Sequence, residues 1–371
     1  MAVVLGTRPE MIKLSVLIAL LGDQARVIHT GQHFDTALTR QNLWSGSPHL
    51  QLKVGGHHRG VQIGNATTHL TRSWLSDPPA VVIVQGDTNA ALSGALAANA
   101  LHIPLIHVEA GLRSHDRAMP EEHNRVVIDH LADICCAATE GNIENLRAEG
   151  IPDHRIILTG NPIVEAVHLT DRDHATARDV TAPLDGRPYI LCTLHRPENV
   201  DDPDRLHRVL TNLAALDLPV LLTIHPRTQQ RVRQFGLSQL LTQLHVIDPL
   251  SYPAFLAVAE QATLLISDSG GIQEEATTLG VNLIVLRRAT ERPEALGTHC
   301  ALVPQPEQLH AVAISMTRCS NEPTTTSSPF GDGRASARIA DLAEMVAADK
   351  TSPHVHFCEP AAPSKISPAQ Q

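Results

Sequence analysis

Aromatic residues are scarce in this chain, since Phe, Trp and Tyr together make up 2% of its 371 residues. Proteins that bind single-stranded nucleic acid stack bases on aromatic side chains, so this composition disfavours that class. The formal net charge of −10 also disfavours binding to a phosphate backbone, which requires a basic surface. Any phosphate contact should therefore come from a few local Arg, Lys and His side chains. That pattern suits a small ligand, and we expect no nucleic-acid partner.

Long apolar runs are absent as well. The longest, residues 14–21, is far too short to span a bilayer. Met1 leads directly into an apolar segment with no basic region before it and no cleavage site after it, which disfavours a signal peptide. We therefore expect a cytoplasmic protein with no membrane partner.

The six cysteines show no CxxC pair and no regular spacing, which favours buried, reduced thiols. His354, His356 and Cys358 lie close together, but their Pro-, Ser- and Gln-rich surroundings indicate a disordered tail over residues 349–371. No HxxxH or carboxylate–histidine spacing on one helix joins His195 and His225, the histidines that follow predicted strands of the second part of the chain. We expect no metal site.

Short apolar runs alternate with helical patterns along most of the chain, which is typical of parallel sheets covered by helices on both faces. In the first part of the chain the predicted strands are 3–5, 26–29, 80–84, 105–108 and 156–158. In the second they are 189–194, 220–224, 245–247, 263–266 and 283–286, with helices near 203–215 and 272–279. The length also favours two domains. We predict an α/β protein with two Rossmann-like, doubly wound domains.

The predicted boundaries follow changes in composition. They are a first domain at 1–170, a polar linker at 171–188, a second domain at 189–333, a helix at 334–348 and the tail.

The junction at 267–276 is the most informative local feature. An apolar strand ends in Ser269, Gly270 and Gly271, and a helix with two successive carboxylates follows. Paired glycines let backbone N–H groups approach a ligand, and the helix directs its positive end to the same place. A strand-to-helix turn capped by Ser would explain the serine but not the two acids. The junction therefore predicts a phosphate site.

Charged residues also follow the predicted strands of the first domain. Arg8 and Lys13 stand at the start of the first helix, where they suit a charged ligand or, alternatively, solvent. Asp87 and Glu109 each follow an apolar strand directly. Burial beside a strand raises a carboxyl pKa toward neutrality, which suits proton transfer, although either acid could instead cap a loop. Glu121 begins a later helix and is the less certain third acid.

His195 and His225 follow two apolar strands of the second domain. Single histidines are more often structural than catalytic, but ligands of doubly wound sheets bind at strand ends. The basic and acidic segment 287–294 follows another strand of the same domain. Of the two histidines, His195 is the stronger candidate.

Taken together, the motifs resemble the non-hydrolysing UDP-N-acetylglucosamine 2-epimerases. The matching segments, in the family's order over about four fifths of the chain, are GTRPEMIK (6–13), TGQHFD (30–35), QGDT (85–88), HVEAGLRS (107–114), MPEEHNR (119–125), TGNPIVEA (159–166), LHRPENVDD (194–202), HPRT (225–228), DSGGIQEEA (268–276) and TERPEAL (290–296). The resemblance implies a GT-B-like pair of Rossmann domains with the active site between them. It also implies a homodimer and no cofactor.

The implied reaction eliminates UDP across C1–C2 to 2-acetamidoglucal and re-adds it after protonation of C2 on the other face. By resemblance the catalytic residues are Asp87, Glu109, Glu121 and His195. The implied substrate-binding residues are Arg8, Lys13, Phe255, Ser269, Gly270, Gly271, Glu275 (on the ribose) and Arg292. Weaker candidates are Gln32, His33, Arg113 and His225.

Other activities remain open on the same fold. They are a 2-epimerase for a modified sugar such as a UDP-diacetamido-uronic acid, a hydrolysing 2-epimerase, a GT-B glycosyltransferase and a non-catalytic UDP-sugar sensor. The tract that begins at Phe34 and Asp35 departs from bacterial family members, in a region that the family uses for an activating UDP-sugar.

Overall fold

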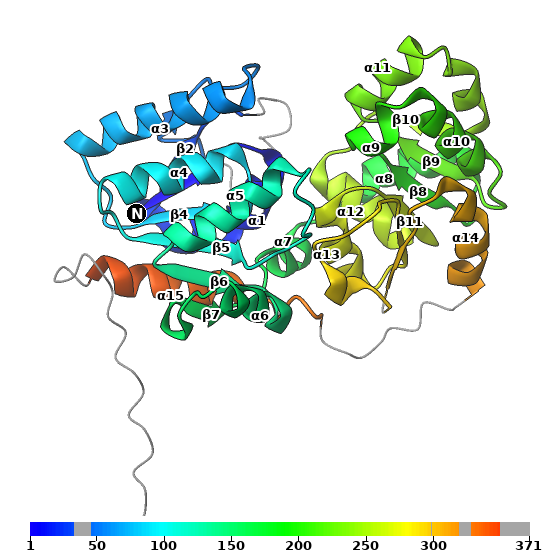
Figure 1. Cartoon of the computed structure of the whole chain (residues 1–371). Coiled ribbons are helices and arrows are strands. Elements are labelled where there is room, and N and C mark those ends of the chain that lie inside the picture. The colour runs from blue at the N-terminus through cyan, green and yellow to red at the C-terminus, as the bar shows by residue number, and fades with distance from the viewer. Residues whose placement is uncertain (33–45, 298, 319–327, 349–371) are drawn as a thin grey trace, which may run out of the picture.

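The computed structural model describes residues 1–32, 46–297, 299–318 and 328–348. Figure 1 shows two α/β lobes side by side, the first blue to green and the second green to orange. Several predictions lie outside the described residues. They concern His33, the tract at Phe34 and Asp35, the tail at 349–371 and its cluster of His354, His356 and Cys358.

The first lobe is built on a parallel sheet of seven strands with the order β3-β2-β1-β4-β5-β6-β7. The strands are β1 (Ala2–Leu5), β2 (Arg26–His29), β3 (Leu50–Gln51), β4 (Val82–Gln85), β5 (Leu105–Ala110), β6 (Ile134–Ala137) and β7 (Ile156–Leu158). Its helices are α1 (Arg8–Leu21), α3 (Arg59–Ser76), α4 (Asn89–Ala100), α5 (Pro120–Leu131), α6 (Glu140–Ala148) and α7 (Ile163–Leu169).

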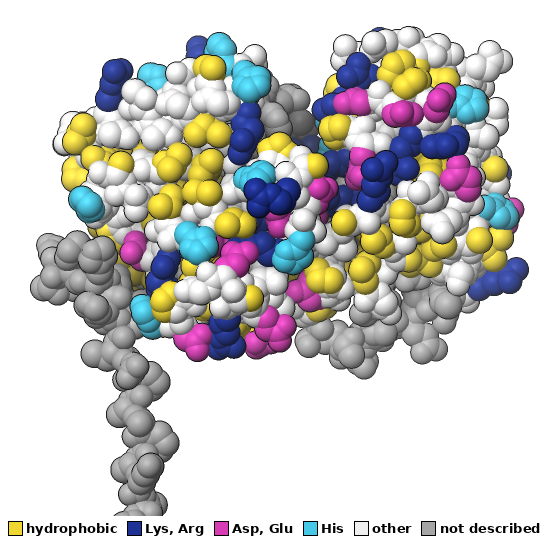
Figure 2. All heavy atoms as spheres, viewed as in Figure 1, with side chains coloured by type: hydrophobic (Ala, Val, Ile, Leu, Met, Phe, Trp, Pro, Cys, Tyr) yellow, Lys and Arg dark blue, Asp and Glu magenta, His cyan; other side chains and the backbone are white. Residues whose placement is uncertain are grey.

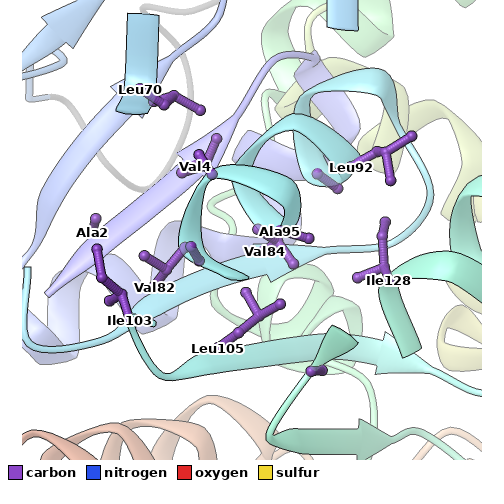
Figure 3. Close-up of a cluster of buried hydrophobic side chains, with 14 of the residues drawn as sticks. Ala2, Val4, Leu70, Val82, Val84, Leu92, Ala95, Ile103, Leu105 and Ile128 are labelled. Carbon is purple, nitrogen blue, oxygen red and sulfur yellow. The ribbon is translucent and has the colours of Figure 1, made fainter. Parts of the chain in front are cut away.

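Small residues let helix α4 pack close to this sheet. A Cβ added at Gly94 would lie 2.9 Å from Val84 Cγ1 and 3.2 Å from Val4 Cβ, so the helix backbone nearly touches the strands. Figure 3 shows Ala95 and Leu92 of α4 over Val84 and Val4 in this core. Close packing of Ala, Val, Leu and Ile fills most of this cluster, with Trp74 as an aromatic member.

The second lobe is built on a parallel sheet of six strands with the order β10-β9-β8-β11-β12-β13. The strands are β8 (Ile190–Thr193), β9 (Val220–Thr223), β10 (His245–Ile247), β11 (Leu264–Ser267), β12 (Leu283–Val285) and β13 (Cys300–Leu302). Its helices are α8 (His174–Thr181), α9 (Pro197–Val200), α10 (Pro203–Ala214), α11 (Pro226–Gln234), α12 (Tyr252–Gln261), α13 (Gly270–Leu279) and α14 (Leu309–Arg318). Short 3-10 turns lie at Gly22–Gln24, Asp153–Arg155, Ala182–Leu184, Ser238–Gln243, Pro293–Ala295 and Pro306–Gln308.

The final helix, α15 (Ala335–Ala348), returns to the first lobe (Figure 1). Its apolar face, which includes Ile339, Ala343 and Val346, packs in one buried cluster with Leu14 and Leu17 of α1. The segment 171–188, expected as a linker, contains α8, whose Ala177 is buried with residues of α12. The segment is therefore not a bare linker, because its helix α8 packs against α12.

The predicted fold class is confirmed, with two doubly wound parallel sheets. Strands β3, β6 and β13 were not predicted, because β3 and β13 contain no β-branched or aromatic residue and β6 contains two adjacent cysteines. Across the described part of the chain, every helix is too short or too polar to cross a membrane.

Candidate active site

The strand order of each sheet reverses at one pair of neighbouring strands, β1 and β4 in the first lobe and β8 and β11 in the second. Ligands of doubly wound sheets bind beyond the carboxyl ends of such a pair. The loops after β1 and β4 carry Arg8 and Asp87, and the loops after β8 and β11 carry His195 and Ser269. Figure 2 shows basic, acidic and His side chains gathered along the boundary between the lobes.

A buried ionic cluster joins the two lobes. Lys13 Nζ lies 2.6 Å from Glu109 Oε1 and 2.7 Å from Glu274 Oε2. Arg292 contacts the same carboxylates, through Nη2 at 2.9 Å from Glu109 and through Nε at 2.7 Å from Glu274. None of these four side chains is more than 8% exposed. Lys13 and Glu109 belong to the first lobe, and Arg292 and Glu274 belong to the second. The cluster therefore holds the two lobes together at this boundary.

The cluster determines the ionisation of Glu109. Burial alone would raise its pKa, but Lys13 and Arg292 lower it to about 2. Glu274, which shares these cations, has a raised pKa because burial outweighs the attraction of Arg292 and Lys13. The expectation that burial moves the pKa of Glu109 toward neutrality is therefore wrong, since nearby opposite charges win over desolvation.

The backbone at Glu109 adopts an unusual conformation. Its φ of 66° lies in the left-handed region, and the pairing of β5 with β6 shifts register between Val108 and Ala110. This conformation costs a residue with a Cβ roughly 1–2 kcal/mol. It turns the Glu109 side chain toward the second lobe, where Arg292 and Glu274 lie. Gln85 and Asn161 also donate hydrogen bonds to its carboxylate.

Asp87 is the more accessible of the two predicted acids, with its side chain 26% exposed. Arg125 of α5 forms an ion pair with it and a second one with Glu122 at 3.0 Å. Asn124 Nδ2 donates to the backbone oxygen of Asp87 at 2.7 Å. Helix α5 therefore holds both the backbone and the side chain of this residue.

Glu121 and Glu122 have different surroundings. Glu122 is buried and accepts hydrogen bonds from the backbone N–H groups of Ser114 and His115, at 3.0 and 2.8 Å. It therefore shapes the loop before α5. Glu121 is half-buried, and its side chain forms no hydrogen bond or ion pair with any other described residue. Of the two, Glu121 is the one free to meet a ligand.

Arg8 and Glu275 lie where α1 meets the second lobe. Arg8 Nη2 donates to the backbone oxygen of Leu250 at 3.2 Å. Glu275 is buried beside Tyr252, and burial raises its pKa to about 7 despite Lys13 nearby. Phe255, one turn further along α12, is half-buried in the same apolar cluster as Tyr252. The residues predicted to bind the nucleoside thus lie on α12 and α13.

The N-terminus of α13 has the predicted glycines, but they differ in environment. A Cβ at Gly270 would lie 2.4 Å from Glu291 Oε1 and 2.7 Å from Arg292 Nη1, so this position admits only glycine without rearrangement. A Cβ at Gly271 would have no heavy atom within 4 Å. Ser269 precedes the helix without a side-chain capping bond. Of the two glycines at the N-terminus of α13, Gly271 is therefore the one with free space beside its backbone.

His195 is held by a buried aspartate. Its Nδ1 lies 3.2 Å from Asp268 Oδ1, and its ring lies 5.3 Å from the ring of His225. Asp268 also accepts from the backbone N–H groups of His195 and Arg196. His225 Nδ1 accepts from the backbone of Arg227 as a helix cap. His195 therefore has a fixed, partly exposed ring, and His225 lies beside it.

The remaining weak candidates have structural contacts. Arg113 is buried, with both Glu149 and Asp129 as ion-pair partners at 2.6 and 2.8 Å. Gln32 Oε1 accepts from the backbone of Ala90 at 3.1 Å. Arg113 is thus engaged away from the boundary between the lobes.

Three residues of the site were not predicted, namely Glu274, Asp268 and Arg125. Each belongs to a motif named from the sequence, yet its role depends on a partner far along the chain, such as Lys13 for Glu274. Only the succession of two carboxylates after Gly271 signalled Glu274. In the described ranges, no group of three His, Cys, Asp or Glu side chains could hold a metal ion.

Comparisons with known proteins agree with this geometry. The family model described as UDP-N-acetylglucosamine 2-epimerase matches residues 22–344. The UDP-N-acetylglucosamine 2-epimerase of Methanocaldococcus jannaschii is 37% identical over 362 residues, which is 92% of this chain and 98% of that protein. The UDP-2,3-diacetamido-2,3-dideoxy-D-glucuronate 2-epimerase of Pseudomonas aeruginosa is 34% identical, over 91% of this chain and 97% of that protein.

A solved structure gives the same result. The crystal structure of the Methanocaldococcus jannaschii enzyme in complex with UDP-GlcNAc and UDP superposes with a TM-score of 0.84. It covers 93% of this chain and 99% of that one. The sheets, the site geometry and these matches lead to one conclusion: the chain belongs to the UDP-N-acetylglucosamine 2-epimerase family.

Proposed function

We propose that this protein interconverts UDP-N-acetylglucosamine and UDP-N-acetylmannosamine without hydrolysis. One observation carries the proposal. Asp87 lies in the loop after β4, Glu109 lies near the end of β5, and Glu109 contacts Arg292 of the second lobe directly at 2.9 Å. The groups that we propose for proton transfer and for diphosphate binding therefore lie at one boundary, as a C2 epimerisation through loss of UDP requires.

The second lobe binds the nucleotide in this proposal. The backbone N–H groups of Gly270 and Gly271 at the N-terminus of α13 suit the diphosphate, because a helix N-terminus attracts anions. The N–H of Ser269 donates to Ser267 Oγ at 3.0 Å, so we propose that Ser269 contributes its hydroxyl. Glu275 accepts from the ribose hydroxyls and Phe255 lies near the uracil. His195, which Asp268 orients, assists at the departing diphosphate. Arg8 and Lys13 reach the substrate from the first lobe, and Arg292 from the second.

The first lobe performs the proton transfers. A carboxylate among Asp87, Glu109 and Glu121 removes the C2 proton, and the electron pair forms the C1–C2 double bond. The C1–O bond breaks and its electrons pass to the diphosphate oxygen. A second group then protonates C2 on the opposite face, and the diphosphate oxygen attacks C1 again. No outside oxidant or reductant is needed.

The low pKa of Glu109 limits its ability to act as the base. A carboxyl whose pKa is held at about 2 is a weak base at neutral pH. Substrate phosphates that bind Lys13 and Arg292 would draw these cations away from Glu109 and raise its basicity.

The same proposal includes a homodimer in the cytoplasm, and a division into domains at 1–170 and 189–333. These statements derive from the family resemblance and from composition.

An NMR experiment tests the activity. The purified protein is incubated with UDP-N-acetylglucosamine in D₂O, and the sugar signals are followed. We expect deuterium at C2 and a UDP-linked manno product. Free N-acetylmannosamine would instead indicate a hydrolysing enzyme. Absence of exchange, together with exchange in the UDP-diacetamido-glucuronate substrate of the Pseudomonas aeruginosa relative, would assign the modified sugar.

A further inference from the structure

His107 of β5 is fully buried, and both of its ring nitrogens are engaged. Its Nδ1 lies 2.6 Å from Asp129 Oδ1, and its Nε2 lies 2.8 Å from the backbone oxygen of Gly86. Because a carbonyl oxygen only accepts, Nε2 carries a proton toward Gly86. Gly86 directly precedes Asp87, so the imidazole fixes the loop that holds this acid.

Asp129 of α5 connects the imidazole to the turn after β5. Its second oxygen accepts from the backbone N–H of Gly111 at 3.2 Å and pairs with Arg113 at 2.8 Å. Gly111 lies two residues after Glu109. One carboxylate therefore ties the loop of Asp87, through His107, to the turn that carries Glu109.

Both tied segments have left-handed backbone. The φ angle is 65° at Gly86, 66° at Glu109 and 82° at Gly111. A residue with a Cβ keeps such a conformation only where its surroundings hold it. Gly111 also has no room for a Cβ, which would lie 2.4 Å from the backbone oxygen of Asn142. The contacts of His107 and Asp129 help to hold these segments in place, beside the bond from Gly86 N–H to the Val108 oxygen and the bond from Asn145 Nδ2 to the Gly111 oxygen.

We propose that His107 and Asp129 are positioning residues for the 2-epimerase reaction. They fix the separation of Asp87 and Glu109 through the backbone at Gly86 and Gly111, and neither touches the substrate. This inference rests on the proposed function. Reacting groups must be placed within a fraction of an ångström, so the loss of one tie should lower turnover more than affinity.

Two substitutions of His107 each remove one of the two hydrogen bonds of its imidazole and keep the other. The amide nitrogen of His107→Asn stands where Nδ1 does, so it keeps the bond to Asp129 and loses the one to Gly86. The amide nitrogen of His107→Gln stands where Nε2 does and keeps the bond to Gly86. Glu149→Gln is the matched control, because Glu149 pairs with Arg113 but contacts neither Gly86 nor Gly111.

We expect His107→Asn to lower kcat about 100-fold with KM within about threefold of the wild type. His107→Gln should recover part of this loss, because it keeps the bond to Gly86 and loses the one to Asp129, and Glu149→Gln should retain kcat. Wild-type kcat in His107→Asn, or no advantage of His107→Gln over it, would overturn the inference. If His107→Asn does not fold, Asp129→Asn takes its place with the same expectation, and an unchanged kcat there would also overturn it.

Amide hydrogen exchange gives a readout that needs no turnover. In His107→Asn the exchange of residues 85–88 should accelerate about tenfold, because the loop loses its tie, and in Glu149→Gln it should not change. Equal exchange in the two variants would contradict the positioning role. A wild-type protein without epimerase activity would refute the proposed function, and the exchange data would still decide whether His107 holds the Asp87 loop.

Discussion

At the residue scale, Glu274 is the anion that completes the ionic cluster between the lobes. Asn161 of the first lobe donates to it at 2.8 Å, and two cations share it with Glu109. Removal of one partner from a buried ionic cluster leaves uncompensated charge. Such a cluster therefore depends on each of its members more strongly than a surface ion pair does.

We expect Glu274→Gln to lower the free energy of unfolding by about 3 kcal/mol, since Lys13 then keeps Glu109 as its one carboxylate among the described residues, and Glu109 is shared with Arg292, which also pairs with Glu291. Urea denaturation measures the change. The control is Glu307→Gln, which removes an exposed carboxylate 3.4 Å from Arg208 and should cost less than about 1 kcal/mol. Similar losses in the two variants would contradict the account of the cluster.

Glu10 supplies a pH prediction. Its carboxylate accepts from Gly6 N–H, Thr7 Oγ1 and Thr88 Oγ1 without a cation, and burial raises its pKa to about 7 from the ordinary 4.5. The folded state therefore binds the proton more tightly than the unfolded state does. Stability should fall as pH rises from about 4.5 to about 7 and should then level off.

The variant Glu10→Gln should lack this slope. Its free energy of unfolding relative to the wild type should increase by up to about 3 kcal/mol across that pH range. Chemical denaturation at a series of pH values measures the difference, in which the similar contribution of Glu275 cancels. A difference independent of pH would show that Glu10 is not protonated in the folded protein.

At the element scale, helix α15 depends on the first lobe although it follows the second in sequence. Glu165 of α7 accepts from the backbone N–H of Ser336 at 2.9 and 3.0 Å, and so caps the start of the helix. Ile339 then buries its side chain completely against α1. The helix thus contributes to the core of the first lobe.

Ile339→Ala should destabilise the protein by about 2–4 kcal/mol, because it leaves a cavity under α15. Met345→Ala on the same helix, at a side chain that is 56% exposed, should change stability by less than about 0.5 kcal/mol. Thermal denaturation of the two variants checks the pair. An equal effect would mean that α15 is not docked as described.

Local pattern predicted most elements, because continuous apolar strands and capped helices are encoded within short segments. The helix after Ser269 and the final helix near 335–347 both appear close to their expected bounds. Strand β6 was missed because it contains two adjacent cysteines, and β13 because it has no β-branched or aromatic residue. Pairing with its neighbour β12, not its own sequence, defines β13.

At the scale of the whole molecule, the site depends on how the lobes dock. Arg8, Lys13, Asp87 and His195 were predicted because strand ends of doubly wound sheets collect ligand-binding residues. The pairing of Lys13 with Glu274 joins residues 261 positions apart, and no local pattern specifies it. The low pKa of Glu109 follows from this docking and could not be predicted either.

The two lobes have a division of labour in the proposed reaction. The second lobe binds UDP, and the carboxylates of the first lobe transfer the protons. Two variants test it, Asp87→Asn and Gly271→Asp. The second places a negative charge at the end of α13, at a position where an added Cβ would have no heavy atom within 4 Å. It should therefore weaken UDP binding by repulsion of the diphosphate.

The most direct measurement is the UDP dissociation constant of Asp87→Asn by calorimetry, set beside its kcat for C2 epimerisation. The account predicts kcat lowered at least about 100-fold with UDP affinity within about threefold of the wild type. Gly271→Asp should show the opposite bias, with the larger loss in UDP affinity. Parallel loss of turnover and UDP affinity in Asp87→Asn would contradict the division of labour.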